Sequence, residues 1–92
     1  MRVRWTEPAA RDLTTICDYI EEHNGKVMAR RVALSVYERV GGLENFPETG
    51  RGGRRAGTRE LVVTGLPYVV IYRVRHDAIE ILRILHGAQR WP

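Results

Sequence analysis

Arginines are the side chains in this sequence best suited to act on another molecule. The densest group lies among glycines within nine residues: Arg51, Arg54, Arg55 and Arg59. The whole chain carries 15 basic against 11 acidic side chains, a net charge of +4. A local group of this kind favours an acidic partner, either a nucleic acid or an acidic protein. A solvated, mobile loop is the alternative interpretation.

Other kinds of site have little support in the sequence. His23, His76 and His86 lack the spacing of metal ligands. The single cysteine, Cys17, excludes an intrachain disulfide, and its place in a helical apolar pattern favours a buried thiol. Neither a G-x-S-x-G nucleophile motif nor a G-x-x-x-x-G-K-[ST] phosphate loop is present. We therefore expect no metal and no cofactor.

The length of the chain limits its organisation. Its 92 residues predict one domain, residues 1–92, with any function on a single surface. Met1 to Trp5 is not followed by an apolar segment, and no stretch approaches the roughly 18 apolar residues of a spanning helix. We expect a cytoplasmic protein that does not use a membrane.

Two helices are predicted in the first half of the chain. Arg2 to Trp5 alternates and is compatible with an edge or central strand, and Thr6-Glu7-Pro8 then combines an N-cap with a first-turn proline. An apolar stripe continues to Asn24-Gly25. A second helix is expected from about Lys26 to Glu44. The short connection predicts an antiparallel helical hairpin.

Three strands are predicted in the second half. Arg51 to Gly57 contains only glycine, arginine and alanine, which favours a mobile loop. Strands should follow at about Arg59 to Val63, Tyr68 to Arg75 and Ala78 to His86. Their short connections make neighbours antiparallel. The order β-α-α-β-β-β predicts an α+β domain, with the helical hairpin packed on a small, mostly antiparallel sheet.

Several short motifs are spread over nearly the whole chain: Trp5, Asp12-Leu13, Tyr19-Ile20, Phe46-Pro47-Glu48-Thr49-Gly50-Arg51, Arg59-Glu60-Leu61, Pro67-Tyr68, Ile71-Tyr72 and His86. In this order and spacing they resemble the RelE/ParE superfamily of toxins from bacterial toxin-antitoxin modules. RelE-like members cleave messenger RNA on the ribosome, whereas ParE-like members inhibit DNA gyrase. One fold thus carries two activities, so the activity of a given chain has to be inferred from its individual side chains.

A RelE-like enzyme would need a base, a cation for the phosphate and an acid, all without a metal. The resemblance implies that these groups would come from Arg59, Arg73, Arg83, His86 and Arg90. Many RelE-like enzymes carry an arginine three residues before the third-strand tyrosine, where this chain has Val69. For His86 a structural role is favoured, with its ring packed at the strand end in phase with Leu82 and Ile84.

The ParE-like branch is favoured by Pro67-Tyr68 and by the ending from His86 to Pro92. This resemblance implies a toxin that inhibits gyrase by binding and is neutralised by an acidic, amphipathic ParD-like antitoxin. A ribosome-dependent messenger RNA interferase is the alternative, and a basic nucleic-acid-binding module is a third hypothesis. If the chain is an enzyme, we expect a metal-independent endoribonuclease.

Candidate contacts to the target or the antitoxin are drawn from the basic loop, the second helix and the terminus. They are Arg51, Arg54, Arg55, Arg59, Tyr37, Arg90 and Trp91. Trp91 either seals the core or meets a partner, and Tyr37, with its neighbours Arg30, Arg31 and Glu38, lies either in an antitoxin groove or on a solvated helix face. On the sheet, burial is expected for Leu61, Val63, Ile71, Tyr72 and Ile81.

Overall fold

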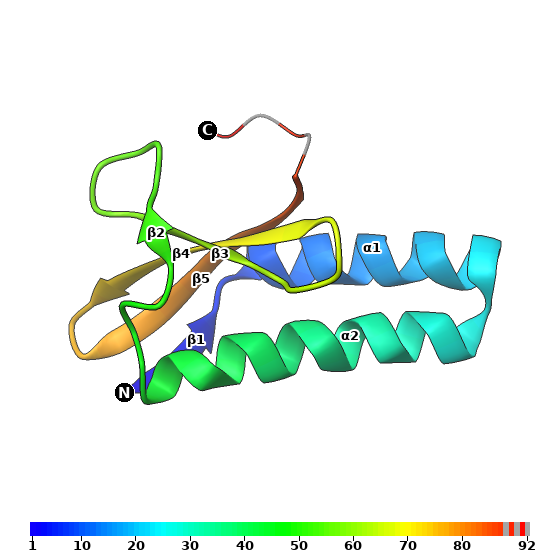
Figure 1. Ribbon diagram of the computed structural model, residues 1–92, viewed down its shortest axis with the longest axis horizontal. Helices are drawn as coiled ribbons and strands as arrows, with labels where there is room; N and C mark the ends of the chain where they lie inside the picture. Colours follow the sequence, from blue (N-terminus) through cyan, green and yellow to red (C-terminus); the bar gives the residue numbers. More distant parts are fainter. Residues whose placement is uncertain (88, 90, 92) are drawn as a thin grey trace.

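A computed structural model describes residues 1–87, 89 and 91, and Figure 1 shows two helices lying side by side against a twisted sheet. The elements are β1 (Arg2–Trp5), α1 (Glu7–Asn24), α2 (Lys26–Gly41), the 3₁₀ turn η1 (Gly42–Glu44), β2 (Arg51–Gly52), β3 (Arg59–Val62), β4 (Tyr68–Arg75) and β5 (Ala78–His86). The sheet order is β1-β5-β4-β3-β2. Strands β1 and β5 pair in parallel, and the other neighbours in this order are antiparallel. The predicted α+β fold is confirmed.

The helical hairpin follows from signals at three positions. The Thr6 hydroxyl oxygen accepts the Ala9 backbone N–H at 3.4 Å, and Pro8 occupies the first turn of α1. Gly25, with φ of 90°, ends α1 and immediately precedes α2. Because L-residues with a side chain rarely adopt this φ, glycine permits the one-residue connection that turns the chain back.

The second helix is shorter than the sequence predicted. It ends at Gly41 rather than Glu44, and Gly42–Glu44 continues as a 3₁₀ turn. Two consecutive glycines lower helix propensity at this point, and the Asn45 N–H donates to the Gly42 carbonyl three residues back, as in a 3₁₀ turn. The 3₁₀ turn places Leu43 in the core. The apolar stripe of α2 therefore continues through this turn.

The main core lies between the hairpin and one face of the sheet. Ala9 and Leu13 of α1 and Val36 and Val40 of α2 pack on side chains from β3, β4 and β5. The predicted core positions Leu61, Val63, Ile71, Tyr72 and Ile81 are all buried. Both helices therefore have one buried stripe and one exposed side. In the described part of the chain, no helix has the length and apolar content needed to cross a membrane.

The glycine and arginine segment is more ordered than predicted. Arg51–Gly52 forms β2 and pairs with Glu60 and Arg59 of β3. The Gly53 N–H then donates to the Thr58 carbonyl at 2.8 Å. Backbone pairing needs no apolar side chains, so the composition that suggested a mobile loop did not exclude a short strand. In addition β3 ends at Val62, one residue earlier than expected.

A bulge in β5 determines which side chains share a face. Ile71 lies opposite Arg83 and Tyr72 opposite Ile81, so Leu82 is the extra residue. Leu82 is consequently half-buried, whereas Ile84 is in the core. Leu82 is therefore out of the predicted phase, whereas Ile84 and His86 lie in regular alternation beyond the bulge.

Candidate functional site

The sheet face opposite the hairpin is polar and carries two buried carboxylates. Glu80 lies between two arginines, with an ion pair to Arg4 and an Nε···Oε1 contact of 2.6 Å to Arg73. Glu60 pairs with Arg51 at 3.2 Å and accepts the backbone N–H of Arg54 at 3.3 Å. Each carboxylate is thus neutralised by arginines on neighbouring strands or in the loop.

Asp12 joins α1 to the open edge of β5. Its carboxylate binds Arg83 with both oxygens, at 2.6 and 3.1 Å, and also accepts the Ile84 backbone N–H at 3.0 Å. This edge N–H lies beyond the end of β1 and would otherwise lack a partner strand. The hydrogen bond to Asp12 raises the pKa of Arg83 above its already high value. Arg83 is therefore a permanent cation.

A hollow of about 520 Å³, which we call the basic hollow, opens on this polar face. Four arginines from the β2–β3 loop, β4 and β5 line it: Arg55, Arg73, Arg75 and Arg83. Pro8, Leu82 and Trp91 supply apolar wall. Arg55 and Trp91 also contact each other, since the guanidinium lies 5.2 Å from the centre of the indole ring. The predicted contact candidates Arg55 and Trp91 are therefore brought to one place.

The other contact candidates lie elsewhere. Arg51 is held at Glu60, and the Arg54 side chain lines a small neighbouring hollow of about 20 Å³. Arg59 turns away from the polar face and donates to the carbonyls of Glu48 and Gly50 at 3.3 and 2.7 Å. Arg90 lies outside the described residues. The arginines that lie close together in the sequence therefore have different structural roles.

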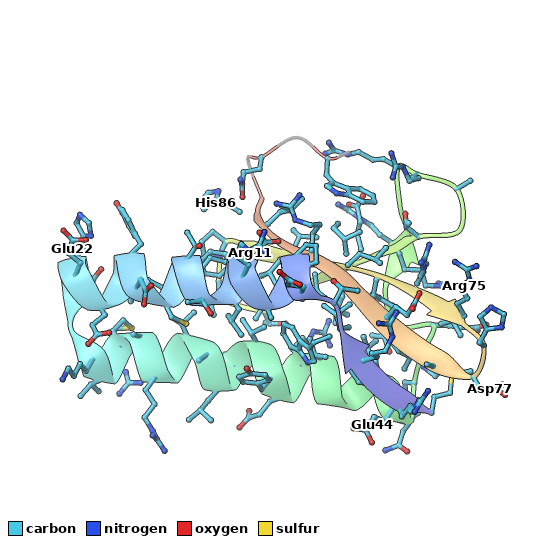
Figure 2. All side chains as sticks on the ribbon, turned by 180° about the vertical axis from the view of Figure 1, so that it is seen from behind. Arg11, Glu22, Glu44, Arg75, Asp77 and His86 are labelled. Carbon is cyan, nitrogen blue, oxygen red and sulfur yellow. The ribbon has the colours of Figure 1, made fainter. Side chains whose placement is uncertain are left out.

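The residues suggested for ribonuclease activity are brought together only in part. Arg73 and Arg83 both line the basic hollow. His86 faces Tyr68 in the strand register, five residues along β4 from Arg73, which is about 16 Å at 3.3 Å per residue. Figure 2 shows His86 and Arg75 at opposite ends of the sheet. The His86 ring lies edge-on to Tyr68, with ring centres 6.0 Å apart.

Val69 is half-buried and lines a small hollow together with apolar and charged residues. The volume of this hollow is about 20 Å³, and its lining also includes Ile71, Leu85, Arg54, Glu60 and His86. A space of this size is far too small for a nucleotide. The position at which many RelE-like enzymes carry an arginine therefore lies at a hollow that has no room for a nucleotide.

A groove of about 360 Å³ crosses the outer side of the helical hairpin. We call it the hairpin groove; its lining includes Trp5, Leu13, Cys17, Ala33 and Tyr37. Tyr37 is 53% exposed, and its ring centre lies 5.2 Å from that of Trp5. Cys17, which was expected to be a buried thiol, is half-buried, and desolvation raises the pKa of its thiol.

Sequence reasoning did not select Arg75, Arg4 or Glu80 for this surface. The two-residue spacing of Arg73 and Arg75 in a predicted strand could have placed both on one face. The partnership of Arg4 with Glu80 depends on the parallel β1–β5 register, which no local pattern specifies. Among residues 1–87, 89 and 91, no group of three histidine, cysteine or carboxylate side chains is arranged to hold a metal ion.

Comparison with known proteins gives relatives over nearly the full length. A toxin designated Y4kP from Sinorhizobium fredii is 43% identical over 91 residues, covering 99% of this chain and 93% of that protein. Toxin RelE2 from Caulobacter vibrioides is 41% identical over 88 residues, covering 96% and 97%. Both relatives carry the word toxin in their names.

The fold and the family agree. A chain in the solved chromosomal ParDE toxin-antitoxin system from P. aeruginosa superposes with a TM-score of 0.88 at 31% identity, covering 94% of this chain and 95% of that one. Residues 3–91 match the family described as the ParE toxin of the type II toxin-antitoxin system parDE. The chain therefore belongs to the ParE toxin family of type II toxin-antitoxin systems.

Proposed function

We propose that this chain is a cytoplasmic toxin that inhibits DNA gyrase by binding it and that a ParD-like antitoxin neutralises it. The match of residues 3–91 to the ParE toxin family carries the proposal. A binding inhibitor needs a surface that holds one state of its target, and no bond in that target has to be broken by the toxin itself. Membership in the family does not by itself identify the target.

The geometry of the polar face supports an inhibitor over a ribonuclease. Arg73 and Arg83 are already occupied by Glu80 and Asp12, and His86 lies about 16 Å along the sheet from Arg73. A general base must come within hydrogen-bond reach of the proton it removes, directly or through one water. This separation is too large for His86 and Arg73 to act on the same phosphodiester.

The hairpin groove supports an antitoxin contact. Arg30, Ala33 and Tyr37 are spaced by three and four residues, so they share one face of α2. Apolar rings with a cation two turns away on the same face suit an amphipathic segment that also carries acidic residues. Such a segment, disordered when free, would bury Tyr37 and Trp5 on binding. The name of the solved ParDE system is consistent with this partner.

Expression in cells tests the proposal as a whole. Induction of the toxin should stop growth and leave DNA breaks at gyrase sites, and co-expression of the antitoxin from the adjacent reading frame should restore growth. Tyr37→Ala should weaken the antitoxin complex about tenfold or more, the range for an interface aromatic. Tyr19→Ala is the control, because Tyr19 is also exposed and lies on α1 outside the lining of the groove. Growth arrest without DNA breaks would contradict the gyrase target.

The messenger RNA interferase remains a second candidate because one relative is named Toxin RelE2. Cleavage of messenger RNA on translating ribosomes, abolished by His86→Ala, would support it. The same experiment in cells distinguishes the two functions, since an interferase shortens transcripts without producing protein-linked DNA breaks.

A further inference from the structure

The basic hollow carries more positive charge than its carboxylates can neutralise. Arg73 shares Glu80 with Arg4, and Arg83 is paired with Asp12. Arg55 and Arg75 have no carboxylate partner among the described residues, and Figure 2 shows Arg75 projecting from the sheet near the β4–β5 turn. Two of the four arginines that line the hollow, Arg73 and Arg83, are thus paired with carboxylates, and the other two leave the hollow cationic.

The arrangement of these groups favours one kind of anion. Guanidinium forks bind the paired oxygens of phosphate or carboxylate. The cations converge from a loop and two strands around one hollow, whereas an extended acidic peptide would follow a row of them. The Trp91 ring and Leu82 add an aromatic and an aliphatic surface beside the cations. A base can stack on such a ring when its phosphate is bound nearby.

We propose that the basic hollow binds a phosphodiester group of a single nucleic-acid strand, with the adjacent base against Trp91, and that it does not cleave this strand. The volume of about 520 Å³ falls in the range of pockets for small molecules, which matches one nucleotide. This inference goes beyond the proposed function, because it concerns direct contact with nucleic acid and requires no gyrase.

The absence of cleavage follows from the side chains around the bound phosphate. Among the described residues, no histidine, tyrosine, glutamate or aspartate lines the hollow. Arginine remains protonated at any working pH and cannot serve as a base. Two carboxylates contact arginines of the lining, and both are engaged: Glu80 by Arg4 and Arg73, and Asp12 by Arg83 and the Ile84 N–H. The hollow thus offers cations for a phosphate but no group that takes up the 2′-hydroxyl proton.

Fluorescence anisotropy of labelled oligonucleotides tests the proposal. The probes are DNA and RNA strands of about 12 nucleotides and the matching DNA duplex, titrated at low and moderate salt. Arg75→Glu should weaken single-strand binding about tenfold and reduce the salt slope by about one. Arg31→Glu is the matched control. Arg31 is an exposed arginine on α2 without a side-chain partner among the described residues, and the variant makes the same change in net charge.

Each result decides the proposal. Single-strand binding that Arg75→Glu weakens and Arg31→Glu changes by less than about twofold supports it. Equal loss in both variants, or no binding by the wild-type chain, overturns it. Displacement of the strand by polyglutamate of equal charge concentration would assign the hollow to an acidic peptide and also overturn it. Shortening of the RNA probe would refute the absence of cleavage, and this outcome is independent of the gyrase assay.

Discussion

Asp12 should contribute more to stability than any other exposed or half-buried carboxylate on α1. Replacing Asp12 with alanine removes two hydrogen bonds to Arg83 and leaves the Ile84 N–H without an acceptor. The side chains of Arg83 and Asp12 are 36% and 18% exposed, so solvent screens the ion pair to about 1 kcal/mol. The unpaired N–H adds about 1 to 2 kcal/mol. We expect Asp12→Ala to lower the free energy of unfolding by about 2 to 3 kcal/mol.

Urea denaturation followed by circular dichroism measures this loss. Asp12→Asn retains an acceptor for the Ile84 N–H and should cost only about 1 kcal/mol. Asp18→Ala is the control, since Asp18 is exposed on the same helix and makes no side-chain hydrogen bond to another described residue; its effect should stay within about 0.5 kcal/mol. Equal, small effects of Asp12→Ala and Asp18→Ala would refute the idea that Asp12 joins α1 to the β5 edge.

Three further predictions concern other parts of the fold. Tyr72→Phe removes the hydroxyl that donates to the Pro47 carbonyl at 2.7 Å and accepts the Gly50 N–H at 2.9 Å, so urea titration should show a loss of about 1 to 2 kcal/mol. Asp77 has a φ of 61° in the β4–β5 turn, which strains a residue with a side chain. Asp77→Gly should remove this strain and raise the free energy of unfolding by up to about 1 kcal/mol, and a decrease would argue against strain at this position. Because burial raises the pKa of the Cys17 thiol, its alkylation by iodoacetamide, followed by mass spectrometry, should reach half-maximal rate at higher pH than that of an unfolded cysteine peptide. An identical midpoint would exclude effective burial.

The hairpin and the long strands were predictable because local signals specify them. Pro8 and Gly25 mark helix boundaries, and apolar periodicity identifies β4 and β5. The short strand β2 was not predictable, since Arg51 and Gly52 carry no apolar pattern and pair only through the backbone. Apolar patterns in a sequence identify strands that are buried on at least one face, whereas both residues of β2 are exposed.

The basic hollow was only partly predictable for a different reason. The sequence identified Arg55, Arg73, Arg83 and Trp91 as candidates, but for different activities. Their convergence depends on strand register and on the Leu82 bulge, which are set by tertiary packing rather than by neighbouring residues. The hairpin groove likewise requires Trp5 of β1 to meet Tyr37 of α2 across 32 positions of sequence.

Purified toxin added to gyrase with supercoiled plasmid and ATP gives the most direct test of the proposed function. The account predicts linear DNA after denaturation and protease treatment, and it predicts that the antitoxin suppresses this cleavage. If folded toxin, with a normal urea transition, yields neither linear DNA nor loss of supercoiling, the gyrase target is wrong. Cleavage of messenger RNA on translating ribosomes by the same preparation would then identify the alternative activity.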